Sequence, residues 1–370
     1  MYPALAVLQA LTNDDQSSES INRLLWIGGI GGMEVNLVKQ AGVPFEAIPA
    51  AGVHGVSLRA LPGNAWQLVR GYRKARRLLH NFQPEVLLFT GGYLAVPVAL
   101  AARFPGRGYR RPRSLLYIPD IEPGLALKSL ALLADRIAIT TESTRAFLRR
   151  HRQVVVTGYP TRADLRTWDK DQARQVLELN SEAPVLLVFG GSKGARSINH
   201  AMWAILPELL ADVQVVHLTG QLDWPEVESV RRRLEASLPR ELYTRYHPYP
   251  FLHKEMGAVL TVADLALCRA GASTLGELPL FALPAVLVPY PYAWRYQQVN
   301  AQYLAERGAA VILQDSELPV KALGVLRELV SDVQKRAQMR QAMASLAQPK
   351  AAEKIAGQLY GLASSLRGMP

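Results

Sequence analysis

Short, continuously apolar runs that end in glycine, proline or a polar residue alternate along the chain with longer runs whose apolar residues recur at helical spacing. The short runs predict β-strands at Leu24–Ile27, Glu46–Pro49, Val86–Thr90, Ser114–Ile118, Arg136–Thr140, Val154–Thr157, Val185–Phe189, Gln214–Leu218, Thr244–Tyr246, Leu265–Cys268, Ala285–Val288 and Ala310–Leu313. The longer runs predict helices at Pro3–Thr12, Trp66–Asn81, Ala195–Leu209, Glu226–Ala236, Ser273–Ala282, Arg295–Arg307 and within Val320–Leu366. Apolar strands that alternate with helices are typical of parallel sheets covered on both faces, so the pattern predicts an α/β fold.

The alternation occurs in two series, which predicts two doubly wound, Rossmann-like domains. The joint is expected near Gly158-Tyr159-Pro160, where glycine and proline interrupt the pattern and the charge composition changes. We therefore expect an N-terminal domain over residues 1–160, a second domain over 161–345, and a C-terminal helix over 346–370 that packs back on the first domain.

Charge is distributed unevenly over the 370 residues. The net charge is +11, and residues 1–160 hold 19 Lys and Arg against 10 Asp and Glu, whereas the remainder holds 23 against 21. A basic half suggests an anionic partner, such as nucleic acid, a membrane surface or a phosphorylated substrate. Nucleic acid is disfavoured because no nucleic-acid-binding motif is visible.

Other features exclude whole classes of protein. Apolar residues make up 49% of the chain and charged residues 20%, which rules out a disordered, collagen-like or coiled-coil chain. Cys268 is the single cysteine, so an intrachain disulfide is impossible and a reducing compartment is expected. The histidines lack metal-ligand spacing, so no metal site is predicted. Neither a signal peptide nor a membrane-spanning run is expected.

The segment Gly190–Arg196 directly follows the strand expected at Val185–Phe189 and opens a helix. Glycines let the backbone approach a ligand closely, and a helix N-terminus presents free N–H groups and a partial positive charge. We favour a diphosphate seat here over a plain turn. The spacing of a Walker loop is absent.

Two further segments follow strands of the second half. Glu277 lies three positions after Thr274, a spacing that fits a helix capping box as well as a carboxylate binding the two hydroxyls of a ribose. Amides at Gln297 and Gln298 open the next helix, where they would read sugar hydroxyls or simply lie on the surface.

In the first half, Asp120 and Glu122 follow a strand and are bracketed by prolines. Either carboxylate could act as a general base, or both could be loop acids near the start of a helix. Gly91-Gly92-Tyr93 also follows a strand, and a substrate contact and a tight turn are equally consistent with it.

A basic amphipathic helix is predicted around residues 66–82. Its cations lie between apolar residues at helical spacing, which suits contact with anionic lipid headgroups or, alternatively, a core-facing stripe with a solvated face. The residues expected to face the membrane are Trp66, Arg70, Arg73, Lys74 and Arg77.

Taken together and in order, these motifs resemble those of the MurG family of bacterial N-acetylglucosaminyltransferases, glycosyltransferase family 28. The resemblance runs over nearly the whole chain. It is carried by Tyr2–Val7, Gly91–Tyr93, Gly158–Arg162, Gly190–Arg196, Arg269–Glu277 and Gln297–Ala301.

The resemblance implies the GT-B fold with an active site in the cleft between two Rossmann-like domains, and inverting transfer of GlcNAc from UDP-GlcNAc to lipid I, a lipid-linked muramyl peptide, to give lipid II for peptidoglycan. It implies no cofactor or tightly bound metal, and a peripheral location at the cytoplasmic face of the bacterial membrane. Carried over by position, Ser192 with Gly191, Lys193 and Gly194 would hold the UDP diphosphate, with Arg162 nearby. Phe251 would lie near the uracil and Glu277 at the ribose. The remaining substrate contacts would come from Ala272, Thr274, Gln297 and Gln298.

The chain departs from the family pattern in three places. The family begins with a strand and a glycine loop before its first helix, whereas this chain begins at Met1-Tyr2. We expect a misplaced start codon and two unpaired sheet edges in the first domain. The family's His-Glu-Gln-Asn is Tyr117-Ile118-Pro119-Asp120 here, and Tyr296 precedes Gln297 where histidine is common. Asp120 is the preferred base, with Glu122 second.

The alternatives are a related UDP-sugar transferase acting on another membrane lipid, a UDP-GlcNAc epimerase on the same fold, and a degenerate paralogue that binds UDP-GlcNAc without transferring it. The destination of the sugar from labelled UDP-GlcNAc distinguishes them.

Overall fold

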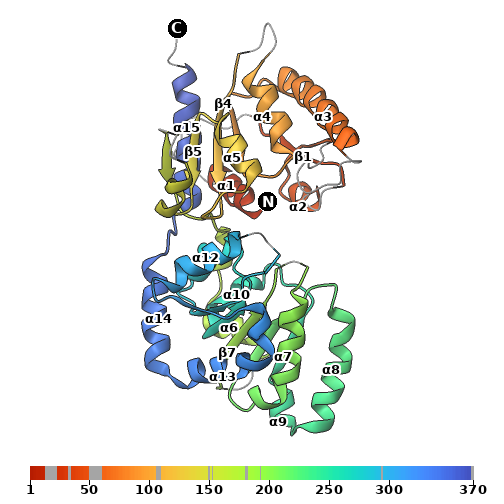
Figure 1. Cartoon of the computed structure of the whole chain (residues 1–370), viewed down its shortest axis with the longest axis vertical. Helices are drawn as coiled ribbons and strands as arrows, with labels where there is room; N and C mark the ends of the chain where they lie inside the picture. Colours follow the sequence, from red (N-terminus) through yellow and green to blue (C-terminus); the bar gives the residue numbers. More distant parts are fainter. Residues whose placement is uncertain are drawn as a thin grey trace. The chain divides into compact units, whose positions relative to one another are not determined.

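The computed structural model describes residues 1–12, 23–31, 35–49, 61–105, 110–148, 151, 153–179, 182–191, 193–292 and 295–367 (Figure 1). These residues form two compact units. Unit 1 comprises residues 1–162 together with 350–370, and unit 2 comprises residues 163–349.

Unit 1 contains parallel strands in two separate sheets. One sheet pairs β1 with β2, and the other has the order β3-β4-β5-β6. The strands and helices of unit 1 are α1 (Tyr2–Thr12), β1 (Trp26–Gly29), α2 (Val35–Gln40), β2 (Phe45–Ile48), α3 (Leu61–Phe82), β3 (Val86–Phe89), α4 (Ala95–Arg103), β4 (Arg113–Ile118), α5 (Leu125–Ala131), β5 (Arg136–Ile139), η2 (Glu142–Phe147), β6 (Val154–Val156) and α15 (Ala351–Arg367).

The larger sheet of unit 1 is covered on both faces. Alternate residues of β4 and β5, among them Leu116, Ile118 and Ile137, pack against α3, α4 and α5 in one buried cluster. Helix α15 packs against β3, β4 and α1, and Figure 1 shows it across the sheet from α3 and α4. Coverage of both faces explains why these strands are apolar at consecutive positions.

Unit 2 is built on a six-stranded parallel sheet with the order β12-β11-β10-β7-β8-β9. Its elements are η3 (Ala163–Arg166), α6 (Lys170–Val176), β7 (Val185–Phe189), α7 (Arg196–Leu209), β8 (Gln214–Leu218), α8 (Trp224–Ser237), α9 (Arg240–Tyr243), β9 (Tyr246–Tyr249), α10 (Met256–Val262), β10 (Leu265–Cys268), η4 (Ala272–Leu275), α11 (Glu277–Leu280), β11 (Ala285–Leu287), α12 (Tyr296–Ala305), β12 (Ala310–Ile312), η5 (Asp315–Glu317), α13 (Leu318–Ser331) and α14 (Val333–Ser345). Helices α7, α8 and α13 cover one face of the sheet in a single buried cluster, and α10 packs near β7.

The strand expected at Leu24–Ile27 lies at Trp26–Gly29, and two elements of unit 2 also differ from the sequence prediction. The helix expected over Ser273–Ala282 is divided into η4 and α11 at Gly276, because Pro279 has no N–H to donate to the preceding turn. The strand expected at Thr244–Tyr246 lies instead at Tyr246–Tyr249, because the short helix α9 runs up to Thr244. Pro248 is tolerated there since β9 is an edge strand.

Candidate functional site

The centre of the unit 2 sheet is a topological switch point. Strands β7 and β10 are neighbours, but from β7 the chain moves outward to β8 and β9, and from β10 it moves in the opposite direction to β11 and β12. Open parallel sheets bind ligands in the crevice at the carboxyl ends of two such strands. The loops that begin there are Gly190–Ala195 and Arg269–Gly271.

The first of these loops is a glycine turn that leads into helix α7. Gly191 and Gly194 have φ angles of +99° and +85°, and the Gly194 N–H donates to the Gly191 carbonyl at 2.9 Å. Helix α7 starts directly afterwards, and its N-cap residue, Ala195, has no side-chain group that could accept a hydrogen bond from the first turn. Its first N–H groups and the positive end of its dipole therefore make a candidate anion seat. Lys193 is exposed beside it, and Ser192 lies outside the described residues.

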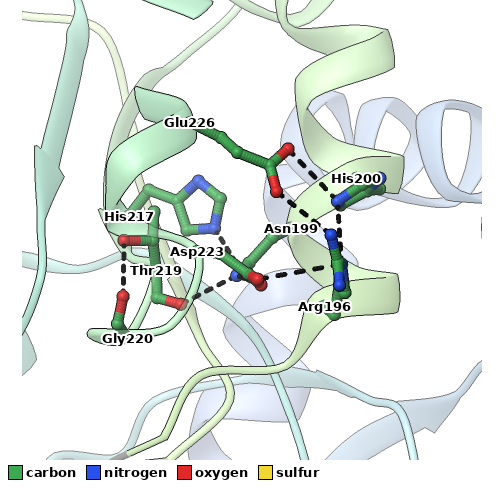
Figure 2. A network of polar contacts seen from close by, with 8 residues as sticks. All are labelled: Arg196, Asn199, His200, His217, Thr219, Gly220, Asp223 and Glu226. Atoms are coloured by element: carbon green, nitrogen blue, oxygen red, sulfur yellow. Dashed lines mark hydrogen bonds and ion pairs between the residues drawn. The ribbon is translucent and has the colours of Figure 1, made fainter. Parts of the chain in front are cut away.

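The glycine loop packs closely against the turn that follows β8, and this contact fixes its position. A Cβ atom at Gly194 would overlap the Thr219 carbonyl oxygen, and one at Gly220 would overlap the Gly194 backbone. The buried Asn199 side chain, on α7, donates through Nδ2 to the Thr219 carbonyl and to Asp223 Oδ2, both at 2.8 Å (Figure 2). The amide of Asn199 thus joins α7 to the turn after β8, and the glycine loop packs against the same turn.

Behind Asn199 lies a buried chain of uncharged groups. His217 Nε2 is 3.0 Å from Asn199 Oδ1, and the Tyr246 hydroxyl is 3.2 Å from His217 Nδ1 and accepts from Trp203 Nε1 at 2.9 Å. Burial lowers the pKa of His217 to about 3 and raises the pKa of Tyr246. His217 is therefore held as a neutral residue that supports Asn199.

Arg269, the first residue after β10, is a buried cation at the second loop. It forms an ion pair with Asp315, and its Nη2 donates to Ser197 Oγ at 2.7 Å. Nη1 also donates to the Val288 carbonyl at 3.3 Å, and the guanidinium lies 5.2 Å from the centre of the Tyr290 ring. Arg269 thereby ties α7, the end of β11 and η5 together at the mouth of the sheet.

Glu277 is the first residue of α11. The Thr274 hydroxyl donates to the Gly271 carbonyl at 2.6 Å, and neither η4 nor α11 has a side-chain cap, so the capping box is not formed. Burial and, secondarily, the negative charge of Glu277 raise the pKa of the Cys268 thiol, which places the Glu277 carboxylate near the end of β10. Ala272 and Thr274 lie in η4, between Arg269 and Glu277.

The amides of α12 hold neighbouring loops. Gln297 Oε1 accepts from the Tyr290 N–H at 2.9 Å, and the buried Asn300 donates to the Ala270 carbonyl at 3.2 Å. Gln298 is half-buried on the same helix. Phe251, after β9, packs edge-to-face on His253 with the ring centres 4.6 Å apart.

The carboxylates of unit 1 differ in their surroundings. Glu122 is buried, with its Oε1 3.7 Å from Lys128 Nζ, whereas Asp120 is half-buried at the carboxyl end of β4. Arg162, the last residue of the first stretch of unit 1, lies over the Tyr2 ring at 5.1 Å.

Four cations of α3 line a surface hollow of about 290 Å³. Arg70, Arg73, Lys74 and Arg77 line it together with Leu78 and Asn81, and the Trp66 side chain is 57% exposed on the same helix. Lys74 Nζ is also 3.6 Å from Glu46 Oε2. In contrast, other arginines of unit 1 serve internal contacts: Arg111 and Arg113 pair with Asp135, and Arg110 donates to a carbonyl of α15.

Sequence reasoning assigned no role to Asn199, Arg269 or Asn300. All three are buried polar residues: Arg269 and Asn300 lie inside motif segments, and Asn199 lies three residues after one, in the predicted helix. The sequence could have indicated them as polar side chains at positions that the helix or strand pattern directs inward. Only the structure identifies the backbone carbonyls that they bind. In the described part of the chain, no helix has the length and apolarity to cross a membrane, and no group of acidic, His and Cys side chains forms a metal-binding cluster.

The two α/β units with parallel sheets, and the glycine loop at the switch point of the second, give the chain the GT-B fold, which it shares with solved glycosyltransferases. The chain belongs to glycosyltransferase family 28: residues 1–108 match the family's N-terminal domain, and residues 185–356 match its C-terminal domain.

Relatives that share one name with each other match this chain over nearly its whole length. It is 37% identical to the UDP-N-acetylglucosamine–N-acetylmuramyl-(pentapeptide) pyrophosphoryl-undecaprenol N-acetylglucosamine transferase of Roseiflexus sp. (strain RS-1), over 96% of this chain and 91% of the relative. It is 35% identical to the enzyme of that name from Desulforudis audaxviator, over 96% and 93%. The crystal structure of Acinetobacter baumannii MurG aligns with a TM-score of 0.71 at 24% identity, over 97% of this chain and 95% of that one.

Proposed function

We propose that this protein transfers GlcNAc from UDP-GlcNAc to the C4 hydroxyl of the muramyl residue in undecaprenyl-diphosphate-linked MurNAc-pentapeptide, with inversion at the anomeric carbon. The observation that carries the proposal is the anion seat at the N-terminus of α7, at the switch point of a family 28 sheet. The names of the relatives supply the identity of donor and acceptor.

In this proposal, unit 2 binds the donor. The Gly191–Gly194 loop and α7 take the diphosphate, Glu277 takes the ribose hydroxyls, and Gln297 and Gln298 read the sugar. Ala272 and Thr274 border the same site, and Phe251 lies near the uracil ring. The contact of Ser192 with the diphosphate, and that of Arg162, remain predictions from the sequence.

The chemistry needs charge stabilisation and a base. The C4 oxygen attacks C1 of GlcNAc, the bond from C1 to the diphosphate oxygen breaks, and negative charge develops on the departing UDP. The positive end of α7 stabilises that charge, so the proposal requires no metal ion at the diphosphate. The proton of the C4 hydroxyl goes to a carboxylate of unit 1.

Asp120 is the better candidate for this base. Glu122 is buried and its charge is engaged by Lys128, whereas Asp120 is half-buried at the carboxyl end of β4. The acceptor is a membrane lipid, and the cationic hollow on α3 with the exposed Trp66 supports peripheral binding to the anionic cytoplasmic face of the membrane.

The test follows the label from UDP-[¹⁴C]GlcNAc when the protein is incubated with a lipid I analogue, with a polyprenyl lipid bearing another head group, or with no acceptor. Label in a disaccharide on the lipid I analogue alone is the expected result. Label on the other lipid assigns a different acceptor, and an altered free UDP-sugar without acceptor assigns an epimerase. Binding of UDP-GlcNAc without turnover overturns the transferase assignment.

A further inference from the structure

Two buried hydroxyls meet behind the loop that carries Asp120. Tyr117, in β4, and Thr140, the first residue after the neighbouring strand β5, are almost completely inaccessible to solvent. The Tyr117 hydroxyl is 2.8 Å from Thr140 Oγ1, which in turn lies 2.8 Å from the Pro119 carbonyl oxygen and 3.2 Å from that of Ile118.

The number of hydroxyl protons decides which group donates and which accepts in the hydrogen bond between Tyr117 and Thr140. A threonine hydroxyl has one proton, and both carbonyl oxygens near Thr140 are acceptors only, so Thr140 donates toward Pro119 and accepts from Tyr117. Burial, together with the negative charge of Asp120, raises the pKa of Tyr117 well above its ordinary value, so the phenol keeps its proton. The chain of donors therefore runs from Tyr117 through Thr140 to the Pro119 carbonyl.

The Pro119 carbonyl belongs to the same planar peptide group as the N–H of Asp120. Holding that oxygen fixes the plane of the peptide on which Asp120 begins, while the proline ring restricts φ of Pro119. The two hydroxyls thus restrain the backbone at the point where the β4 strand gives way to the loop with Asp120 and Glu122.

We propose that Thr140 and Tyr117 are positioning residues that hold the Pro119–Asp120 peptide so that the Asp120 carboxylate is aimed at the acceptor hydroxyl. This inference rests on the proposed transferase function and on Asp120 as its base. Neither hydroxyl exchanges a proton with substrate. Their role is to keep the base within reach, and a small misplacement of a base slows the reaction without weakening donor binding.

The experiment compares Thr140→Val, which removes the donor to Pro119 at nearly constant volume, with Thr140→Ser, which keeps the hydroxyl. The control is Thr157→Val: Thr157 is also fully buried after the next strand, β6, but its hydroxyl contacts the Ile139 and Gly158 carbonyls and not Pro119. Tyr117→Phe is a second, milder variant, because Thr140 can still donate to Pro119.

With the lipid I analogue, we expect Thr140→Val to lower kcat by roughly 10- to 100-fold while KM for UDP-GlcNAc stays within about twofold. Thr140→Ser should recover most of the rate, and Thr157→Val should keep it. Amide hydrogen exchange should accelerate over residues 120–122 in Thr140→Val but not in Thr140→Ser or Thr157→Val.

The outcomes distinguish a failure of the positioning role of Thr140 from a failure of the proposed transferase function. Unchanged exchange over 120–122 in Thr140→Val overturns it, and so does a kcat loss no larger than that of Thr157→Val. If the wild-type protein transfers no sugar, the transferase proposal fails, and the exchange comparison still decides whether Thr140 holds the loop. If Asp120→Asn retains activity, the identity of the base is wrong even where the loop is held as described.

Discussion

The buried Arg269 forms an ion pair with the partly buried Asp315 at the mouth of the unit 2 sheet. The pair joins the residue after β10 to the 3₁₀ turn that precedes α13, and Ser197 on the first turn of α7 contacts both partners at 2.7 Å. One guanidinium therefore sets the relative positions of the helix that would receive the diphosphate and the loop that leads to α12. A buried ion pair contributes little net stability compared with apolar residues, but removal of one partner leaves the other charge uncompensated.

Arg269→Met is therefore expected to destabilise the protein by about 3 kcal/mol, because Asp315 then keeps a largely buried charge without its partner. The double variant Arg269→Met/Asp315→Leu should recover part of that loss, which urea unfolding of the single and double variants measures. Equal midpoints for the two would mean that the pair itself is unimportant.

Gly194→Ala should weaken UDP binding by about tenfold or more, because the added methyl group overlaps the Thr219 carbonyl oxygen and the φ of +85° strains an alanine. Isothermal titration with UDP measures the change. Gly324→Ala in α13, where nothing lies within 4 Å of the added Cβ, is the matched control and should bind UDP normally. Normal binding by Gly194→Ala would remove the loop from the donor site.

Glu277→Gln tests the ribose contact. A hydrogen bond to a charged group contributes about 1.5–3 kcal/mol, so loss of the carboxylate should weaken UDP binding by roughly 10- to 100-fold. UMP and uridine, which share the ribose, should lose affinity in proportion. A lower melting temperature with unchanged UDP affinity would mean that Glu277 only supports the start of α11.

Much of the fold could be predicted because its strands are buried on both faces. Val185–Phe189 is continuously apolar, Gln214–Leu218 is apolar except at Gln214 and His217, and both strands have the bounds expected. The apolar spacing of Ser273–Ala282 predicts one helix, but Gly276 and Pro279 interrupt the hydrogen bonding and divide the segment. In this segment the backbone properties of glycine and proline outweigh the helical spacing of the apolar residues.

The site was predictable only where a residue's role depends on its neighbours in sequence. The glycine loop before α7 follows from a strand, two glycines and a helix start, all contiguous. The supports of that loop do not, because Asn199 acts on Thr219 and Arg269 acts on Asp315 through contacts between distant segments. Sequence spacing carries no information about such pairs until the sheet order is known.

Membrane binding should depend on the α3 hollow. The triple variant Arg70→Gln/Arg73→Gln/Arg77→Gln removes three of its four cations, and at about 1 kcal/mol for each cation, binding to anionic vesicles should fall on the order of 100-fold. Sedimentation with phosphatidylglycerol vesicles measures this fall, and neutral phosphatidylcholine vesicles give the background.

Arg231→Gln/Arg232→Gln/Arg233→Gln changes the net charge equally on the exposed surface of α8, and it should leave vesicle binding close to the wild-type value. Equal losses for the two triple variants would show that overall charge, and not the α3 face, governs binding.

His217 should make the protein acid-sensitive. Its pKa is lowered from 6.5 to about 3 by burial, so between these values the unfolded chain binds a proton at this residue and the folded chain does not. Stability is therefore lost as pH falls from about 6.5 toward 3, by at most about 1.4 kcal/mol per pH unit from this group. Burial also lowers the pKa of His247 and of His151, and both residues change the stability in the same direction.

Urea unfolding at pH 7, 6, 5 and 4.5 measures this effect. The loss of stability with falling pH should be shallower in His217→Gln than in the wild type. This holds even where the variant is less stable at pH 7 because its contacts with Asn199 and Tyr246 are altered. An identical pH slope in the two proteins would show that His217 is already protonated in the folded state.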